Sequence, residues 1–309
     1  MTEFETIVNP PQEVFEQVVK LTGETEDWSF HLDDYKYYLS SYDQFLLVAV
    51  VEKGTSNLAA TVSLARWDGE DGPLFSVGMY YVVPKYRGTG LGKPIFQKVM
   101  DIVGDNNCTL TGEVKMSKKY AREFGFDKFP PHWLLHSTLL TTDCVIPEKV
   151  SEKYTTKKWS DVDYDALTAY DRTVCTRDRK KLMTPWFNMK NTFSRVVLDQ
   201  TENIVGYGII RLVTLNKLNI APFYADNIEA AEVLLKDLLE MVPNWKTYSS
   251  FAFLYPECNK DPLMLLEKFA KSKESVSTCV LLRNQFTKKL IPTPDHKVYA
   301  IVDCAFQYV

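Results

Sequence analysis

The sequence predicts an α/β protein, more closely described as α+β, with two tandem domains of the same fold. Three observations predict this class. The chain has 309 residues, about twice the length of a common domain. The predicted elements occur twice in the order helix, hairpin, helix, strand, helix, strand. Between the two series, residues 143–162 contain Pro147, four lysines and mostly polar side chains, which is typical of a linker. We therefore expect domains at residues 1–150 and 151–309.

The elements of the first domain follow from hydrophobic spacing and from turn residues. After Pro10-Pro11, apolar residues recur at helical spacing until Gly23, which predicts a helix. Two runs rich in β-branched residues flank Gly-Thr-Ser-Asn, which predicts a hairpin. A strand then leads through a glycine-rich turn into an amphipathic helix. The expected ranges, in order, are a partly helical stretch over 28–42, hairpin strands over 45–51 and 58–66, a strand over 75–83, a helix over 94–103, a strand over 109–114, a helix over 117–123 and a strand over 133–140.

The second domain repeats this order without visible identity between the two copies. The expected ranges are a helix over 164–182, strands over 194–199 and 205–213, a helix over 229–242, a strand over 249–254, a helix over 262–270, and strands over 276–283 and 297–305. Residues 221–227 occupy the position of the glycine-rich turn but contain no glycine. Asp226 or Asn227 is expected to be the N-cap of the helix that follows.

Composition excludes several classes of protein. The 36 basic and 40 acidic residues leave a net charge of −4, which argues against nucleic-acid binding as the main task. The longest apolar run of the N-terminal half, residues 45–51, is far shorter than the ~20 residues that span a bilayer. The N-terminus has no basic and apolar leader. Without a CxxC pair, the cysteines are expected to be reduced thiols of a cytoplasmic protein; they are Cys108, Cys144, Cys175, Cys258, Cys279 and Cys304.

One segment, residues 79–93, carries recognisable chemistry. Three glycines within five residues lie between a strand and a helix. Glycines let backbone N–H groups converge on an anion, and the helix adds its positive dipole end. The spacing does not fit a Walker A loop, because Arg87 replaces the first glycine and Pro94 follows Lys93. It does not fit the dinucleotide GxGxxG pattern either. A plain connecting turn remains as the alternative to a pyrophosphate site.

Arg87-x-x-Gly90-x-Gly92 after an apolar strand resembles motif A of the GCN5-related N-acetyltransferases (GNAT). Gly125-Phe126 resembles motif B of that family. The resemblance covers about residues 10–140. Residues 160–309 resemble the acetyltransferase-like C-terminal domain of the YitH/HolE type, through Tyr170-Asp171, Asp178-Arg179, Val205-Gly206-Tyr207-Gly208, the stretch 221–227 and Lys297-Val298-Tyr299-Ala300-Ile301.

The resemblance implies two tandem GNAT-like domains, each a mixed, mostly antiparallel sheet flanked by helices. It implies that only the first domain binds acetyl-CoA, used as a co-substrate, and that the second helps to complete the acceptor cleft. The strands over 75–83 and 109–114 should diverge and admit the cofactor. The implied contacts are backbone pairing of the pantetheine arm by Tyr80, Tyr81 and Val82, and pyrophosphate binding by Arg87, Gly88, Thr89, Gly90, Leu91, Gly92 and Lys93.

The catalytic residues are less well defined by the family pattern. The tyrosine that protonates the departing thiolate usually lies four residues before the glycine of motif B, where this sequence has Ala121. Tyr120, one residue earlier, could take this role only if the helix were rotated relative to the family pattern. The strand before motif A contains no acid or histidine, so Glu113 on the next strand is the best base. Removal of the amine proton through water is the alternative. The N–H of Val82 could stabilise the oxyanion.

These inferences predict transfer of an acetyl group from acetyl-CoA to a primary amine by direct attack. The alternative is an acyl-CoA-binding or sensing protein without turnover. The acceptor is expected to be a small molecule or a peptide amine, with no nucleic-acid or membrane partner, and the oligomeric state stays open. An acidic and aromatic stretch, 28–38, could form one wall of the acceptor site. His132 and His136 are expected on one face of a strand without a third ligand, so no metal is expected.

Overall fold

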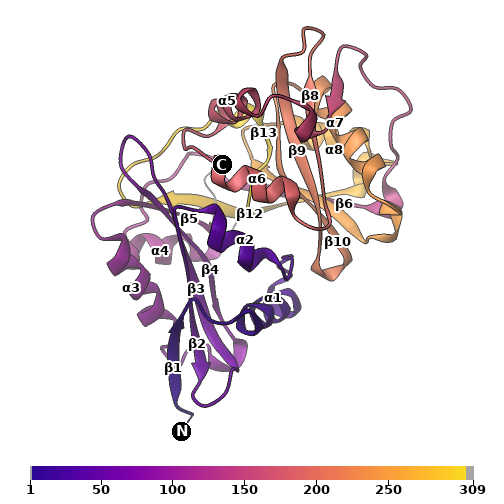
Figure 1. Cartoon of the computed structure of the whole chain (residues 1–309). Coiled ribbons are helices and arrows are strands. Elements are labelled where there is room, and N and C mark those ends of the chain that lie inside the picture. The colour runs from indigo at the N-terminus through magenta and orange to yellow at the C-terminus, as the bar shows by residue number, and fades with distance from the viewer. Residues whose placement is uncertain (1, 304–309) are drawn as a thin grey trace. The chain divides into compact units, whose positions relative to one another are not determined.

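The computed structural model describes residues 2–303. These form two compact units, one of residues 2–129 with 284–290 and the other of residues 130–283 with 291–303. This grouping differs from a division at residue 150 in two places, because 130–150 belong to the second unit and 284–290 to the first. The expected α+β class is confirmed, since each unit has helices on the faces of a mostly antiparallel sheet (Figure 1).

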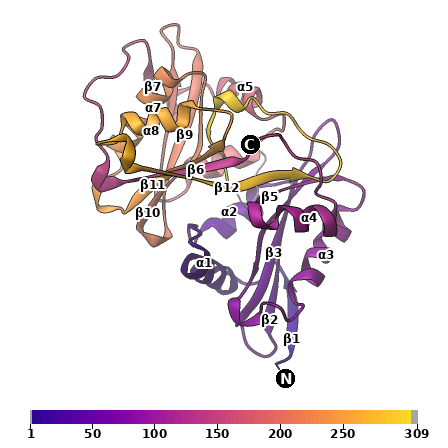
Figure 2. The same cartoon turned by 180° about the vertical axis from the view of Figure 1, so that it is seen from behind.

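The first unit has a sheet of five strands in sequence order, extended by residues from the C-terminal part of the chain. Among the described strands of this unit, only β4 and β5 are parallel. Helices α1 and α2 cover one face, and α3 and α4 cover the other (Figures 1 and 2). The elements are β1 (Phe4–Val8), α1 (Gln12–Glu26), α2 (Asp34–Ser41), β2 (Gln44–Glu52), β3 (Leu58–Trp67), β4 (Leu74–Val82), α3 (Gly92–Val103), β5 (Asn107–Glu113) and α4 (Ser117–Phe124).

The predicted hairpin is confirmed as β2 paired with β3, and β1 is an additional edge strand that the sequence did not indicate. The prediction that the first helix ends at Gly23 is wrong. Helix α1 continues to Glu26 and ends at Asp27, which has a left-handed φ of 59°. A glycine inside a helix costs only about 1 kcal/mol, and burial of Val18 and Thr22 on the same helix outweighs that cost.

The C-terminal end of β12 (Val276–Phe286) completes the sheet of the first unit beside β5. The hydroxyl of Thr109 donates to the carbonyl of Gln285 (3.1 Å), and the N–H of Thr287 donates to the carbonyl of Cys108 (2.9 Å). The side chain of Gln285 is fully buried. Its Nε2 donates to the carbonyls of Ser117 (3.1 Å) and Phe126 (2.6 Å), at the two ends of α4. Residues distant in sequence therefore fix the position of α4.

Gln285→Leu should destabilise the first unit by about 2–4 kcal/mol, because it keeps the volume but removes the buried amide that donates to the carbonyls of Ser117 and Phe126. Gln97→Leu is the matched control, since the Gln97 amide lies exposed on α3 and, among the described residues, bonds only Asp101. Urea unfolding measures both. Equal midpoints for the two variants would contradict this role of Gln285.

The second unit has a sheet in the order β12, β6, β11, β10, β9, β8, β7, with β13 paired to β10; only β10 and β11 are parallel. Helices α7 and α8 lie on one face and α5 and α6 on the other (Figures 1 and 2). The elements are β6 (Leu134–Leu140), β7 (Thr155–Lys157), α5 (Tyr164–Val174), α6 (Lys180–Asn188), β8 (Thr192–Leu198), β9 (Ile204–Val213), β10 (Lys217–Ala225), α7 (Ile228–Met241), β11 (Ser250–Pro256), α8 (Asp261–Lys268) and β13 (Val298–Ala300).

Two expectations for this unit are wrong. The single helix over 164–182 is two helices, because the chain turns after Val174 and brings Arg179 back onto Asp171 of α5. Strand β10 was not predicted, although the stretch over 221–227 begins inside it. The N-cap assignment is confirmed, since the side chain of Asn227 accepts from the N–H of Ala230 (2.9 Å). Of the strand expected over 297–305, β13 is found, and residues 304–305 lie outside the described residues.

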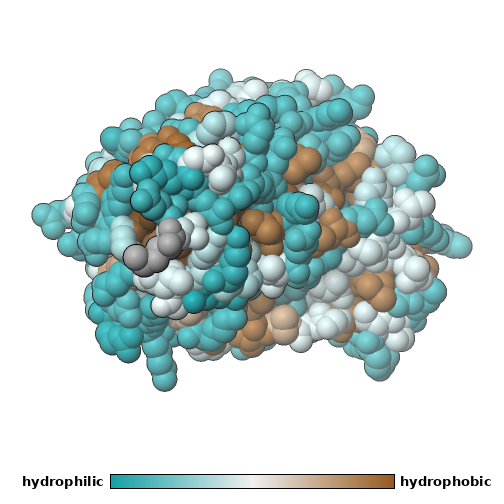
Figure 3. All heavy atoms as spheres, turned by 90° about the horizontal axis from the view of Figure 1, so that it is seen from below, coloured by the Kyte–Doolittle hydropathy of each residue, from teal (hydrophilic) through white to brown (hydrophobic). Residues whose placement is uncertain are grey.

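The face drawn in Figure 3 is mostly hydrophilic, with hydrophobic residues in patches between. Among residues 2–303, no helix combines the length and the apolar composition that a membrane crossing would require.

Candidate functional site: a glycine loop beside diverging strands

Strands β4 and β5 diverge halfway along β4. They pair in parallel from Leu74 opposite Asn107 to Val77 opposite Leu110, and the pairing ends there although both strands continue. At the same place β4 has a bulge against β3, where Met79 adopts a left-handed φ of 45°. A bulge bends the strand that carries it and re-aims its backbone. Residues 78–82 of β4 are therefore unpaired on the β5 side among the described residues, as the family resemblance implies.

The turn after β4 needs glycine at two positions. Gly88 and Gly90 have φ values of 81° and 90°, a conformation that other L-residues rarely adopt. A Cβ added at either position would meet no atom within 4 Å. Backbone conformation, and not crowding, therefore requires these glycines. The turn is exposed and leads directly into α3.

Several backbone donors of this turn have no acceptor. The N–H groups of Arg87 and Thr89 bond within the turn, to the carbonyls of Pro84 and Tyr86. Within residues 2–303, no acceptor is found for five further N–H groups, those of Gly88, Gly90, Leu91, Gly92 and Lys93. Helix α3 also has no side-chain cap and no acidic residue in its first turn. Such a set of free donors at a helix N-terminus is suited to an anion.

Gly92 is required for a different reason. A Cβ at this position would lie 2.4 Å from the hydroxyl of Tyr80 and 3.1 Å from Cγ2 of Val82. The first turn of α3 therefore packs directly against β4. This contact places the free N–H groups beside the unpaired part of the strand.

The side chain of Arg87 points toward the end of α1. Its guanidinium forms an ion pair with Glu26 and lies 5.8 Å from the ring centre of Tyr81, and its Nε donates to the carbonyl of Val82 (3.0 Å). The hydroxyls of Thr25 and Tyr81 are 3.0 Å apart. Sequence reasoning missed Thr25 and Glu26, because it ended the helix at Gly23. Helical spacing carried past that glycine could have found them.

Tyr120 lies in the core of the first unit. Its ring stacks on Phe96 (5.7 Å between centres) and lies 6.4 Å from the ring of Tyr80. Gly112 on β5 makes room for it, since a Cβ there would be 2.8 Å from the Tyr120 ring. Burial raises the pKa of Tyr120, and the neighbouring Tyr80 and Glu113 raise it further. No hydrogen-bond partner of the Tyr120 hydroxyl is found in the described part of the chain.

Glu113 ends β5 and forms an ion pair with Lys115 (2.6 Å). The hydrogen bond to Glu113 is the main cause of the raised pKa of Lys115. The charge of Glu26 raises this pKa further, and the charge of Arg87 lowers it. Of the two expected catalytic residues, Glu113 is thus paired with Lys115, and its charge also acts on the hydroxyl of Tyr120.

The acidic and aromatic stretch over 28–38 is mostly structural. Asp34 is buried and accepts from the N–H of His31 (2.9 Å), and Tyr35 donates to the carbonyl of Pro10 (3.0 Å), where burial raises its pKa to about 12. Tyr38 is also buried. These side chains cannot line an acceptor site as expected. Trp28, whose ring lies 6.2 Å from that of Tyr81, is still available.

The corresponding place in the second unit is built differently. Strand β10 leads to α7 without a glycine, and Asn227 caps the first turn of that helix. Glu229 adds an acidic side chain to the same turn. The N-terminus of α3 in the first unit therefore has free N–H groups, whereas the N-terminus of α7 in the second unit is capped.

Comparison with known proteins identifies related families. A family model described as a protein of unknown function (DUF1248) matches residues 1–174, and one described as an acetyltransferase (GNAT) domain matches residues 167–300. An uncharacterized protein of Caenorhabditis elegans is 27% identical over 173 residues, which are 52% of this chain and 53% of that protein. The match therefore spans about half the length of that relative.

Solved structures share the fold over nearly the whole chain. A candidate acetyltransferase from Pyrococcus horikoshii has a TM-score of 0.71 at 15% identity, covering 98% of this chain and 96% of that one. A tandem GNAT protein from the clavulanic acid biosynthesis pathway has a TM-score of 0.64 at 13% identity, covering 93% and 98%. A GCN5-related N-acetyltransferase from Sphaerobacter thermophilus has a TM-score of 0.61 at 11% identity, covering 98% of each chain. The expected tandem fold is confirmed.

Proposed function

We propose a function for this chain, which belongs to the family described as protein of unknown function DUF1248, matches an acetyltransferase (GNAT) domain over residues 167–300 and shares the fold of a tandem GNAT protein. The protein is an N-acetyltransferase that moves an acetyl group from acetyl-CoA to a primary amine by direct attack. The observation that carries this proposal is the glycine loop. Five of its N–H groups have no acceptor among residues 2–303, and the loop adjoins the unpaired part of β4.

Each residue of the loop has a distinct task in this proposal. The free N–H groups of the loop, those of Gly88, Gly90, Leu91, Gly92 and Lys93, bind the pyrophosphate of acetyl-CoA, assisted by the dipole of α3. Lys93 adds a positive charge at the start of the helix. The backbone of Tyr80, Tyr81 and Val82 pairs with the pantetheine arm, because β5 leaves that side of β4 unpaired. Gly88 and Gly90 supply the backbone geometry, and Gly92 lets the helix approach the strand.

The reaction forms a bond between the amine nitrogen and the acetyl carbon and breaks the carbon–sulfur bond of the thioester. An amine with an ordinary pKa near ~10 must first lose a proton, which we assign to Glu113 directly or through water. The N–H of Val82 stabilises the oxyanion. Tyr120 gives its proton to the departing CoA thiolate, and the second proton that the amine nitrogen loses on becoming an amide restores the hydroxyl. The raised pKa of Tyr120 keeps this hydroxyl protonated at neutral pH, so it donates to the sulfur and does not act as the base.

Tyr120→Phe should lower kcat by about 10²- to 10⁴-fold, the usual contribution of a positioned acid, with little change in the KM for acetyl-CoA. In the wild type, kcat/KM should rise with pH as the amine deprotonates, without a decline near pH ~10 from loss of the tyrosine proton. Steady-state kinetics measure both. Tyr35→Phe removes another buried hydroxyl of the same unit and should leave kcat unchanged. An unchanged kcat in Tyr120→Phe would remove Tyr120 from the mechanism.

Binding of an acyl-CoA without turnover is the second candidate function. It is supported by the position of Tyr120 in the core, and by the pairing of Glu113 with Lys115 and of Glu26 with Arg87. Release of CoA from acetyl-CoA in the presence of amines separates the two functions, because a sensor would bind acetyl-CoA and leave it intact.

The acceptor is a small-molecule or peptide amine in this proposal. The ring of Trp28, half-buried near Tyr81, is suited to a cation. The second unit binds no acetyl-CoA, because Asn227 already caps the helix that would receive the pyrophosphate. We place the protein in the cytoplasm, which is consistent with five free cysteines among the described residues.

A further inference from the structure

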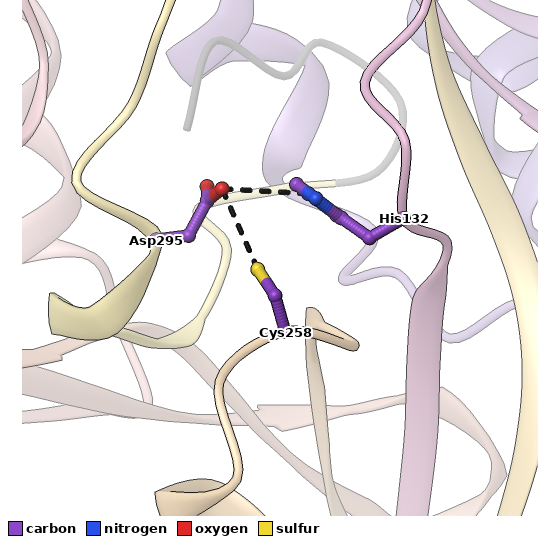
Figure 4. Close-up of side chains that lie close together, drawn as sticks. All are labelled: His132, Cys258 and Asp295. Carbon is purple, nitrogen blue, oxygen red and sulfur yellow. Dashed lines mark hydrogen bonds and ion pairs between the residues drawn. The ribbon is translucent and has the colours of Figure 1, made fainter.

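Three metal-binding side chains from distant parts of the sequence lie together in the second unit (Figure 4). His132 precedes β6, Cys258 follows β11 and Asp295 precedes β13. Their ligand atoms all lie within 4.8 Å of one another. Nε2 of His132 is 3.5 Å from Oδ2 of Asp295, and Sγ of Cys258 is 3.6 Å from the same oxygen.

Sheet register explains why the histidine and the cysteine meet. Strands β6 and β11 are antiparallel, with Leu134 opposite Pro256. Continuing this register two residues beyond each strand places His132 opposite Cys258. The N–H of Glu257 donates to the carbonyl of Trp133 (2.9 Å), so the two backbones stay paired up to the site. Directly opposed residues have Cβ atoms about 5 Å apart.

The third ligand is held by a buried amide. The side chain of Asn259 is almost fully buried, and its Nδ2 donates to the carbonyls of His296 (3.2 Å) and Val298 (3.0 Å). Asn259, the residue after Cys258, is therefore hydrogen-bonded to His296 and Val298, which follow Asp295. The three ligands are carried by backbone segments that are fixed to one another.

The distances between these ligand atoms fit a divalent metal with tetrahedral coordination. Zinc bonds of about 2.0 Å to nitrogen or oxygen and 2.3 Å to sulfur place ligand atoms roughly 3.3–3.5 Å apart, close to the two distances observed. Imidazole and thiolate favour zinc over calcium or magnesium. We propose that His132, Cys258 and Asp295 bind Zn²⁺. The thiol proton that now bonds Asp295 leaves to solvent, and the sulfur bonds the metal. Cys258 is exposed, so water completes the fourth position.

This site is independent of acetyl transfer. Every ligand belongs to the second unit, whereas the glycine loop belongs to the first. A bound metal would link the ends of β6 and β11 to the segment before β13. It should therefore raise the melting temperature of the protein, since a ligand that binds only the folded state stabilises that state.

The test is a titration of the full chain, made without added histidines and stripped by a chelator. Calorimetry with Zn²⁺ should give one equivalent, and Co²⁺ should give the visible absorption of a tetrahedral site with a thiolate. Cys258→Ser and Asp295→Asn should each weaken binding by more than about 100-fold, since even indirect supports of a metal contribute 10- to 100-fold. Circular dichroism confirms that both variants are folded.

Cys279→Ser is the matched control. Cys279 is also exposed and lies opposite His136 across β12 and β6, but no third ligand joins that pair among the described residues. Binding should be unchanged in this variant. A wild type that takes up neither metal would overturn the proposal, as would a folded Cys258→Ser that binds like the wild type or a loss of binding in Cys279→Ser.

Discussion

Gly90→Glu should abolish the binding of acetyl-CoA while the protein stays folded. The substitution places a carboxylate among N–H groups that have no acceptor in the described residues and that we assign to the pyrophosphate. Two like charges about 4 Å apart repel by about 4 kcal/mol near a protein surface, which corresponds to roughly a thousandfold in affinity. The φ of 90° adds strain for any side chain. Calorimetric titration of acetyl-CoA measures the effect.

The variant Gly54→Glu separates the effect of the carboxylate on acetyl-CoA binding from the effect of backbone strain. Gly54 lies in the exposed turn between β2 and β3, has a φ of 75° and, like Gly90, has open space around its Cβ position. Both variants should lose about 1–2 kcal/mol of stability through backbone strain. Only Gly90→Glu should lose binding. Equal affinity in the two variants would place the cofactor elsewhere.

Arg179→Met should destabilise the second unit by about 3–5 kcal/mol. The side chains of Arg179 and Asp171 are 1% and 2% exposed, and Nε of the arginine is 3.0 Å from the carboxylate. Burial alone would lower the pKa of Arg179, but the Asp171 carboxylate together with Tyr224, Cys175 and Tyr207 outweighs burial and holds that pKa well above its ordinary value. Removing one partner of a buried ion pair leaves an uncompensated charge. Urea unfolding, followed for the second unit, measures the change.

Arg172→Met is the matched control, because Arg172 pairs with Asp178 at 2.7 Å with both side chains more than half exposed. Exposed pairs contribute about 0–1 kcal/mol. The double variant Asp171→Leu with Arg179→Met should recover part of the loss, since it leaves no unpaired charge. A loss in Arg179→Met no larger than in Arg172→Met would contradict the account of this pair.

Local features of this fold could be predicted from the sequence. The β2–β3 hairpin, the glycine turn and the N-cap at Asn227 depend on residues close to one another in the chain, so spacing and residue type were sufficient. Gly88 and Gly90 are needed for their backbone conformation, which a motif can reveal. Gly92 is needed because of Tyr80, and that contact is visible only in three dimensions.

The features that could not be predicted join residues far apart in sequence. Arg87 meets Glu26 across 61 positions, and Thr109 meets Gln285 across 176. Neither periodicity nor propensity encodes such pairs. The same holds for the proposed metal ligands. The sequence indicated His132 and His136 on one face of a strand without a third ligand, but His132 lies before β6 and faces Cys258. The burial of Arg179 beside Asp171 could not be predicted either. It depends on the turn after Val174, where helical periodicity predicted a continuous helix.

Acetyl transfer from acetyl-CoA to an amine can be observed directly. The full chain is incubated with acetyl-CoA and a panel of polyamines, amino acids, aminoglycosides and peptides with free amines, and the products are followed by mass. We expect one acetylated amine per CoA released, with no acetylated protein when acetyl-CoA is supplied alone. Tight binding of acetyl-CoA with no acetylated amine from any acceptor would contradict it and leave an acyl-CoA-binding protein.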